Sequence, residues 1–301
     1  SGDETVVASH ADFFASPRVT EDGTRILWLQ WNHPQMPWGS TRMFVGNIVN
    51  KEGKVAIAKY FQHGSMLAPL FSPNNELFYV HDSTGWWNLY IVNRRGFEIN
   101  LLPEAQEVGW PQWKFGQQPF ALHPMIGVNE AAVISGKELI LVDVMRQEGR
   151  VLETGYQTYS LGVTYSKDGN KVYVVAGDEF RKSHVIEVNL RTEAVQVVQN
   201  IAETPVSTDY ISQPRQIQFP TTEGDFVYGY LYLPKNPEYA APKGTKPPLL
   251  VKAHDGPTDA SSTELNLEHQ FYTSRGWVVL DVDYRGSTGY GTIYRNKLNE
   301  M

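Results

Sequence analysis

Hydrophobic and polar positions repeat along the first two thirds of the chain. Three stretches share the same order of an apolar or aromatic residue, a polar turn and a run of β-branched or aromatic residues. They are 19–29, 71–81 and 165–175. Aligned on the turn residues Asp22, Asn74 and Asp168, they are separated by 52 and 94 residues, the second being twice 47. We therefore expect a missing member near residue 120, where 113–124 offers an aromatic residue, a glycine turn and another strand.

A second apolar run follows each turn. These runs are 42–49, 87–93, 138–144 and 183–190. The Asp-Gly and Asn-Asn pairs of the turns suit tight hairpins, because both tolerate positive φ. A period of about 47 to 52 residues with about four short strands per unit is typical of β-propeller blades, and a sandwich with accidental regularity is the alternative. Because only four units are present, we expect the first residues to lie in the middle of a propeller.

The pattern changes after about residue 205. Two strands around a polar turn are expected in 215–234, and a solvated loop rich in Pro, Gly and Lys follows at 236–248. The continuous apolar runs 249–254 and 277–284 are typical of buried strands in a parallel sheet. The second part of the chain is therefore expected to differ in architecture from the first.

A helix is expected between the two buried runs. Ser261 with Glu264 fits a capping box at its start, and Gly276 fits its end. A strand, a helix and a second strand with a right-handed crossover indicate that an open α/β sheet begins here. We therefore predict two domains: blades of a partial β-propeller over 1–205, and the N-terminal part of an α/β domain over 206–301.

Composition narrows the classes of function. The chain has 301 residues, of which 41% are hydrophobic, so it can bury a sizeable core. Its net charge is −7 and no basic run reaches four residues, so nucleic acid and anionic membranes are not expected as partners. No apolar stretch approaches the ~20 residues of a membrane-spanning helix. The chain has no cysteine, which excludes disulfides and thiolate catalysis and is compatible with a cytoplasmic location.

Several motifs suggest sites but are incomplete. The stretch 286–291, "GSTGYG", follows a predicted strand, yet its spacing is not the G-x-G-x-x-G of dinucleotide-binding folds. The eight histidines show no metal-binding spacing, so neither a metal nor a cofactor is expected. Asp281 and Asp283 could mimic paired carboxylates and are interpreted as turn or surface residues. Trp86 and Trp87 are interpreted as blade packing, with the wall of a peptide pocket as the alternative.

The stretch 253–258, "AHDGPT", points most directly to chemistry. It follows a buried strand, so its turn is expected at the carboxyl edge of the sheet, where α/β proteins bind ligands. Gly256 is a candidate donor of one backbone N–H to an oxyanion hole, and a plain strand-ending turn is the alternative. A hydrolase of this type also needs a G-x-S-x-G nucleophile elbow, which the chain lacks. Ser160 and Ser287 have no paired flanking glycines.

These motifs resemble the prolyl oligopeptidase family of serine peptidases, in particular its acylaminoacyl-peptidase and dipeptidyl-peptidase-like branch. "ADFFASPRVTEDGTRILWLQWNHPQMPW" and "STGWWNLY" resemble the propeller of that branch. "LLVKAHDGPT" and "YTSRGWVVLDVDYRGSTGYGTIYRNKL" resemble the start of its hydrolase domain. The resemblance implies an all-β propeller segment of about four blades, followed by the first strands of an α/β-hydrolase sheet. It also implies hydrolysis of short peptides by a Ser-His-Asp triad.

The resemblance assigns roles to residues of the "AHDGPT" motif. The second glycine of the family's His-Gly-Gly-Pro motif donates an N–H to the oxyanion, which implies that role for Gly256. The residues expected near the site are His254, Asp255, Pro257 and Arg285. Asp255 replaces the family's first glycine, and its carboxylate would repel a developing oxyanion unless it points away. All three triad residues of the family correspond to positions after Met301.

Two hypotheses follow. In the first, the chain is a segment of a serine peptidase, inactive alone, whose partners are peptide substrates and the remainder of the hydrolase domain. In the second, it is a catalytically inactive propeller that serves as an interaction or regulatory module. The first is favoured because a sheet that ended after the strand of 277–284 would leave an apolar edge unpaired. A second copy of the chain is a further candidate partner.

Overall fold

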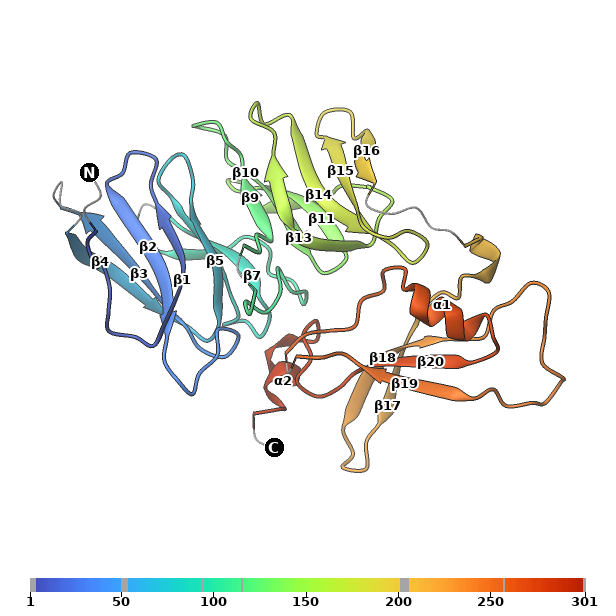
Figure 1. The fold of residues 1–301 in the computed structure, drawn as a ribbon. Helices are drawn as coiled ribbons and strands as arrows, with labels where there is room; N and C mark the ends of the chain where they lie inside the picture. Colours follow the sequence, from blue (N-terminus) through green and yellow to red (C-terminus); the bar gives the residue numbers. More distant parts are fainter. Residues whose placement is uncertain are drawn as a thin grey trace.

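The structure is a computed structural model that describes residues 4–49, 54–93, 95–114, 116–200, 206–256 and 258–299. These residues form five four-stranded sheets. Figure 1 shows the first four sheets beside one another in chain order, with the fifth sheet and both α-helices below them.

The first four sheets are antiparallel, with strands paired in chain order. Blade 1 contains β1 (Phe13–Val19), β2 (Arg25–Trp31), β3 (Arg42–Ile48) and β4 (Val55–Gln62). Blade 2 contains β5 (Met66–Phe71), β6 (Leu77–His81), β7 (Asn88–Val92) and β8 (Glu98–Asn100). Blade 3 contains β9 (Phe120–Leu122), β10 (Glu130–Ser135), β11 (Glu138–Asp143) and β12 (Glu148–Val151). Blade 4 contains β13 (Thr158–Tyr165), β14 (Lys171–Gly177), β15 (His184–Asn189) and β16 (Val195–Asn200). The predicted missing repeat near residue 120 is confirmed, because β9 starts blade 3.

The repeat is also visible in the backbone. The first strands of blades 1, 2 and 4 each contain a non-glycine residue with positive φ: Ser16 at 52°, Ala68 at 45° and Leu161 at 63°. At these points the pairing of each first strand with the second shifts register. A bulge of this kind bends a strand and increases its twist. The same bend therefore recurs with almost the same spacing as the turn residues.

The turns of neighbouring blades contact each other. Asn75 of the β5–β6 turn donates a side-chain hydrogen bond to the Asp22 carboxylate of the β1–β2 turn, at 2.9 Å. The side-chain oxygen of Asn74 accepts from the Gly127 N–H of blade 3, at 3.2 Å. Both links join residues 53 positions apart. The aligned turn residues thus form contacts from one blade to the next.

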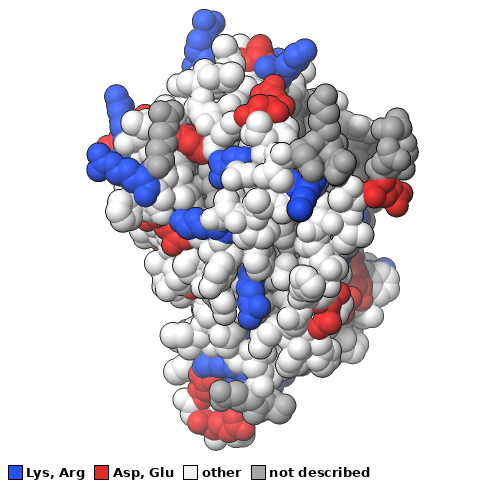
Figure 2. Space-filling view, turned by 90° about the vertical axis from the view of Figure 1, so that its left-hand side faces the viewer, with Lys and Arg blue, Asp and Glu red and all other residues white. Residues whose placement is uncertain are grey.

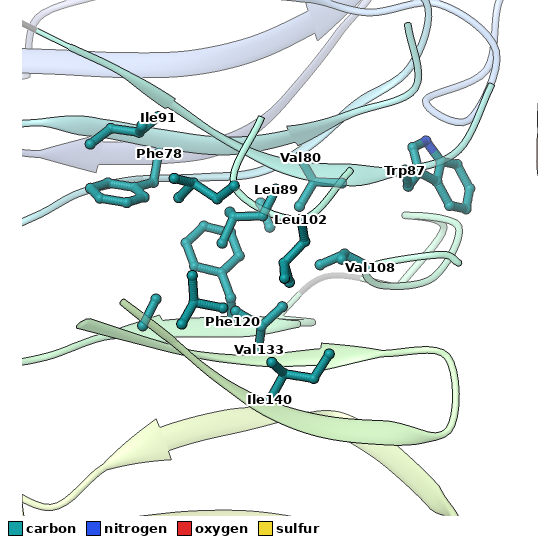
Figure 3. Close-up of a cluster of buried hydrophobic side chains, with 14 of the residues drawn as sticks. Phe78, Val80, Trp87, Leu89, Ile91, Leu102, Val108, Phe120, Val133 and Ile140 are labelled. Atoms are coloured by element: carbon teal, nitrogen blue, oxygen red, sulfur yellow. The ribbon is translucent and has the colours of Figure 1, made fainter. Parts of the chain in front are cut away.

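Apolar side chains fill the space between neighbouring blades. Figure 3 shows the cluster between blades 2 and 3, in which Phe78 and Leu89 face Phe120 and Val133. Trp87 belongs to this cluster and is fully buried, which confirms its interpretation as blade packing. Similar clusters lie between blades 1 and 2 and between blades 3 and 4. Because burying one such side chain stabilises by about 1.5–3 kcal/mol, these faces hold the blades together.

The fifth sheet is mixed and follows the 3₁₀ turn η1 (Thr208–Tyr210). Its strands are β17 (Arg215–Pro220), β18 (Phe226–Tyr232), β19 (Leu249–Ala253) and β20 (Val278–Asp283), in the order β17-β18-β20-β19. β19 and β20 are parallel, and the other pairs are antiparallel. α1 (Leu267–Thr273) connects the parallel strands, and α2 (Gly291–Asn296) follows β20. The predicted hairpin, the two later strands and the helix between them are confirmed.

The start of α1 was predicted wrongly. The helix begins after Asn266, whose side-chain oxygen accepts hydrogen bonds from the N–H groups of Glu268 and His269. Ser261 and Glu264 do not form a capping box because tertiary contacts engage both: Ser261 contacts Asp283 and Asp281, and Glu264 accepts two hydrogen bonds from Ser183. Both residues of this sequence motif therefore make tertiary contacts and do not cap the helix.

The predicted end of α1 is confirmed. Gly276 has a φ of +88°, a conformation that glycine adopts without a steric penalty. Its N–H donates to the Thr273 carbonyl at 3.2 Å, and the Trp277 N–H donates to the Tyr272 carbonyl at 3.1 Å. This pair of hydrogen bonds is the Schellman arrangement that closes many helices.

The predicted domain boundary at 205/206 touches 201–205, which lie outside the described residues. β16 ends at Asn200 and η1 begins at Thr208.

Figure 2 shows Lys, Arg, Asp and Glu side chains scattered over the face drawn, most of which is formed by other residues. None of the described helices combines the length and the apolar character that crossing a membrane requires.

Candidate functional site

Two loops meet at the carboxyl edge of the fifth sheet. β19 and β20 are parallel neighbours, with Ala253 opposite Val282 near their ends. The loop after β19 begins at His254, and the loop after β20 begins at Tyr284. Because parallel strands end at the same edge of a sheet, both loops lie where α/β proteins bind ligands.

His254 joins the two loops. Its Nε2 lies 2.7 Å from Ser287 Oγ, and its Nδ1 lies 2.8 Å from the carbonyl oxygen of Asp255. Its ring stacks on Tyr284 with 4.4 Å between ring centroids, and the Tyr284 hydroxyl donates to the His254 carbonyl at 3.3 Å. The imidazole is therefore held at both nitrogens and on one face.

Ser287 is not placed as a nucleophile. It is fully buried, and its hydroxyl also lies 2.7 Å from the carbonyl oxygen of Tyr284. A nucleophile must be exposed to the substrate at the top of a strained turn. Ser287 instead links His254 to the loop after β20.

Gly256 occupies a backbone conformation that favours glycine. Its φ is +132°, and a Cβ at this position would lie 3.2 Å from the Thr258 nitrogen. The residue is exposed, and its N–H has no hydrogen-bond acceptor among the residues that the structure describes. The neighbouring Pro257 lies outside the described residues. An N–H without an acceptor, on an exposed residue in a close-fitting glycine turn, is what an oxyanion donor requires.

The other two residues expected near the site lie at its margin. Asp255 is exposed, and its negative charge adds to the effect of burial in raising the pKa of Tyr284. Arg285 Nη1 donates to the Glu223 carboxylate at 2.5 Å, so its side chain faces the β17–β18 turn. Of the sequence-predicted residues, the structure brings together His254, Asp255 and Gly256, and directs Arg285 elsewhere.

Asp283 was interpreted wrongly as a turn or surface residue. It is 1% exposed, and its carboxylate accepts hydrogen bonds from the Ser261 N–H at 2.7 Å and the Tyr290 hydroxyl at 2.6 Å. Burial raises its pKa. The alternation of Asp281 and Asp283 in an apolar run could have indicated a buried carboxylate. A carboxylate that faces a core must accept hydrogen bonds from donors there.

The loop after β20 and α2 contact the propeller. The Thr292 N–H donates to the Gly85 carbonyl of blade 2 at 2.7 Å. Gly291 has a φ of +78°, and a Cβ there would lie 2.8 Å from the same carbonyl and 3.1 Å from the Trp86 ring. The last glycine of "GSTGYG" therefore permits close approach to a blade, which accounts for the motif without a nucleotide.

Blades 2 and 4 both contact the α/β segment. The Ser183 N–H and hydroxyl of blade 4 each donate to Glu264 at 2.8 Å, and the Leu265 N–H donates to the Asp178 carbonyl at 2.8 Å. Figure 1 shows α2 below blade 2 and α1 below blade 4. The candidate oxyanion loop therefore lies on a segment that is attached to the propeller at two places.

A group of possible metal ligands lies in and beside blade 2, away from this loop. His63, His81 and Glu98 each offer one ligand atom, and these atoms lie within 4.8 Å of one another. The two imidazole rings stack with 4.4 Å between centroids and 13° between planes. Lone pairs in nearly parallel planes do not converge on an ion that must lie about 2.1 Å from each nitrogen. The arrangement fits an aromatic stack better than a metal site.

Comparison with known proteins gives relatives of one kind. No family model matches the chain. Among curated proteins, it is 25% identical over 288 residues to dipeptidyl-peptidase 5 of Schizosaccharomyces pombe, covering 94% of this chain and 33% of the relative. It is 34% identical over 86 residues to the uncharacterized peptidase YuxL of Bacillus subtilis, covering 29% of this chain and 12% of the relative.

Solved structures show the same likeness over most of the chain. A puromycin-hydrolysing peptidase of Mycobacterium tuberculosis aligns with a TM-score of 0.88 and 35% identity, covering 97% of this chain and 45% of its own length. A puromycin hydrolase aligns with a TM-score of 0.87 and 29% identity, over 95% and 43%. Dipeptidyl peptidase 4 of Porphyromonas gingivalis shares the fold, with a TM-score of 0.66 and 12% identity.

The chain thus spans about a third of its first curated relative and less than half of the solved structures. The architecture predicted from the sequence, a propeller segment followed by the first strands of an α/β-hydrolase sheet, is confirmed. The predicted resemblance is confirmed as well: the homologues of this chain are peptidases of the prolyl oligopeptidase family.

Proposed function

We propose that the chain is part of a serine peptidase that hydrolyses short peptides through an acyl-enzyme, and that it contributes the propeller and one side of the oxyanion hole. One observation carries the proposal. Gly256 is an exposed residue at the carboxyl edge of the sheet, in a conformation that favours glycine, and its N–H has no acceptor among the described residues. The peptidase homologues, which align over nearly the whole chain, support it.

In this mechanism a serine attacks the scissile carbonyl and a histidine takes its proton, with an aspartate orienting the histidine. The Gly256 N–H donates to the oxyanion that forms, an interaction worth about 3 kcal/mol in comparable sites. No G-x-S-x-G elbow occurs in the sequence. We therefore propose that the triad comes from sequence outside this chain, and that the isolated chain hydrolyses nothing.

An unpaired sheet edge supports the proposal that further polypeptide packs against this segment. β19 pairs only with β20 among the described strands, and its Leu249 and Val251 are 54% and 58% exposed. Apolar side chains on an unpaired strand are unfavourable in water and favour association. We propose that the remainder of a hydrolase domain covers this edge.

The substrates are proposed to be acylated or dipeptidyl peptides and, given the names of the solved relatives, puromycin. The test uses native protein captured from its source with an antibody against this segment. The captured material should hydrolyse at least one of these substrates and lose activity with a serine-directed inhibitor, whereas the purified 301-residue chain should not. No turnover by the captured material would contradict the proposal.

A second candidate function is a catalytically inactive propeller that binds partners. One observation favours it: Asp255 places a carboxylate beside the candidate donor, where a negative charge opposes an oxyanion. Inactive captured protein of 34.1 kDa would favour this alternative.

A further inference from the structure

The peptide bond between Asp255 and Gly256 has a defined orientation. In a trans peptide the carbonyl of one residue and the N–H of the next point in opposite directions. The Asp255 carbonyl oxygen lies 2.8 Å from His254 Nδ1, so the carbonyl points toward the imidazole. The Gly256 N–H on the same peptide plane therefore points away from the imidazole, and Gly256 itself is exposed.

This contact defines the position of one proton. A carbonyl oxygen can only accept a hydrogen bond, so Nδ1 must carry the proton that it donates to Asp255. In a neutral imidazole the other nitrogen, Nε2, is then an acceptor. Ser287 Oγ lies 2.7 Å from Nε2 and can supply the donor that this tautomer requires.

Ser287 can serve either protonation state of His254. With a neutral imidazole, the serine hydroxyl donates to Nε2. With an imidazolium, Nε2 donates to the serine oxygen, and the hydroxyl turns to the Tyr284 carbonyl at 2.7 Å. In both states Nδ1 keeps its proton. The serine is fully buried, so water does not compete for these positions.

We propose that His254 and Ser287 are positioning residues: Ser287 holds the His254 ring in place through Nε2, and the Nδ1 proton of His254 turns the Asp255–Gly256 peptide so that its N–H faces the substrate oxyanion. This inference rests on the proposed function. Neither side chain touches the reacting atoms, because Ser287 is buried and both imidazole nitrogens are engaged. Without the pair the peptide is free to turn, and its carbonyl would then oppose the oxyanion.

The first test is spectroscopic and does not depend on peptidase activity. Nitrogen-15 NMR of labelled histidine in the protein that carries this segment distinguishes protonated from unprotonated ring nitrogens, with His254→Phe assigning the signals. We expect a protonated Nδ1 and an unprotonated Nε2 in the wild type, and a mixture of tautomers in Ser287→Ala. A wild-type His254 with an unprotonated Nδ1 would overturn the proposal, even in an active enzyme.

The second test is kinetic. Ser287→Ala should lower kcat about tenfold or more, and at most by the 10²–10³-fold that loss of an oxyanion donor costs, with KM within about twofold. Ser212→Ala is the matched control: Ser212 is also buried, and its hydroxyl donates to the Leu233 carbonyl at 2.6 Å, away from the loop. Equal effects of the two substitutions on kcat would overturn the proposal.

The pH profile separates positioning from a loss of packing. An imidazolium carries a proton on both ring nitrogens, so it offers a donor at Nδ1 whether or not Ser287 is present. The titratable groups around the ring are Asp255 on its own loop, Tyr284 stacked on it, and Asp283 at the end of β20. We expect the ratio of wild-type to Ser287→Ala activity to shrink toward one at acid pH. A ratio that does not change with pH would contradict the mechanism.

Failure of this inference differs from failure of the proposed function. If the captured protein has no serine-directed activity, the proposed function fails, and NMR still reports the tautomer. If the protein is active but the tautomer or the Ser287→Ala profile disagrees, only the positioning inference fails.

Discussion

Arg295 of α2 forms a buried ion pair with Asp82 of blade 2, although 213 positions separate them in the chain. Their side chains are 1% and 4% exposed. A second carboxylate, Glu107, lies 3.7 Å from the guanidinium, which also sits 4.0 Å above the Trp87 ring. This cluster fastens the α/β segment, and with it the candidate oxyanion loop, to the propeller.

Arg295→Met is expected to lower the free energy of unfolding by about 3–5 kcal/mol, because the substitution leaves buried carboxylates without their counter-charge. Lys297→Gln is the control, since it breaks an ion pair with Asp225 that is about one third exposed and should cost less than about 1 kcal/mol. Denaturant titration of both variants measures the difference. Similar losses in the two would contradict the role given to Arg295.

Gly256→Ala is expected to lower kcat of the peptidase by about 10²-fold, because a Cβ strains the positive φ and displaces the donor. The same strain should lower the free energy of unfolding by about 1 kcal/mol or more. Gly224→Ala is a suitable control: Gly224 has a φ of +82° with nothing within 4 Å of its Cβ position, and it lies in the β17–β18 turn. Steady-state kinetics of the two variants measure the difference in kcat. A fully active Gly256→Ala enzyme would remove Gly256 from the oxyanion hole.

Asp255→Asn is expected to raise kcat about fivefold at low salt, because it removes a carboxylate that repels the oxyanion. Two negative charges several ångströms apart near a protein surface repel by about 1 kcal/mol or more. The gain should shrink in high salt, which screens exposed charges. Measuring kcat at two ionic strengths tests both statements. An unchanged rate at low salt would mean that the carboxylate points away from the oxyanion.

His81 is expected to make stability depend on pH. Burial lowers its pKa from 6.5 to about 4, with the nearby His63 adding to the effect. Because the unfolded chain binds this proton more tightly, the contribution is fully present above pH 6.5 and is lost as the pH falls through about 4. One proton changes the unfolding free energy by at most about 1.4 kcal/mol per pH unit.

His81→Phe keeps an aromatic ring in the stack with His63 and Tyr90 but cannot titrate. The difference in unfolding free energy between wild type and this variant should therefore fall as the pH is lowered from 6.5 to 4. A difference that stays constant, or that rises, would show that His81 is not held neutral in the folded protein.

The blades were predictable because their signal is local and repeated. Asp22, Asn74 and Asp168 mark turns whose residues tolerate positive φ, and the apolar runs around them bury one face against the next blade. The end of α1 at Gly276 was predictable for the same reason, since the C-terminal glycine acts through its own backbone.

The parts that were missed depend on distant partners. Ser261 and Glu264 match a capping motif, yet contacts with Asp283 and Ser183 engage them, and Asn266 caps the helix instead. The His254–Ser287 contact joins residues 33 positions apart, and no local pattern predicts it. Gly256 could be singled out as a donor, but the orientation of its peptide becomes visible only with the His254 side chain in place.

We propose above all that this chain forms part of an active serine peptidase. Fluorophosphonate labelling of a native source extract, with the labelled species sized by an antibody against this segment, tests it most directly. We expect a labelled band well above 34.1 kDa, the mass of the chain itself. An unlabelled band at 34.1 kDa would contradict it and would identify the chain as a propeller module that binds rather than catalyses.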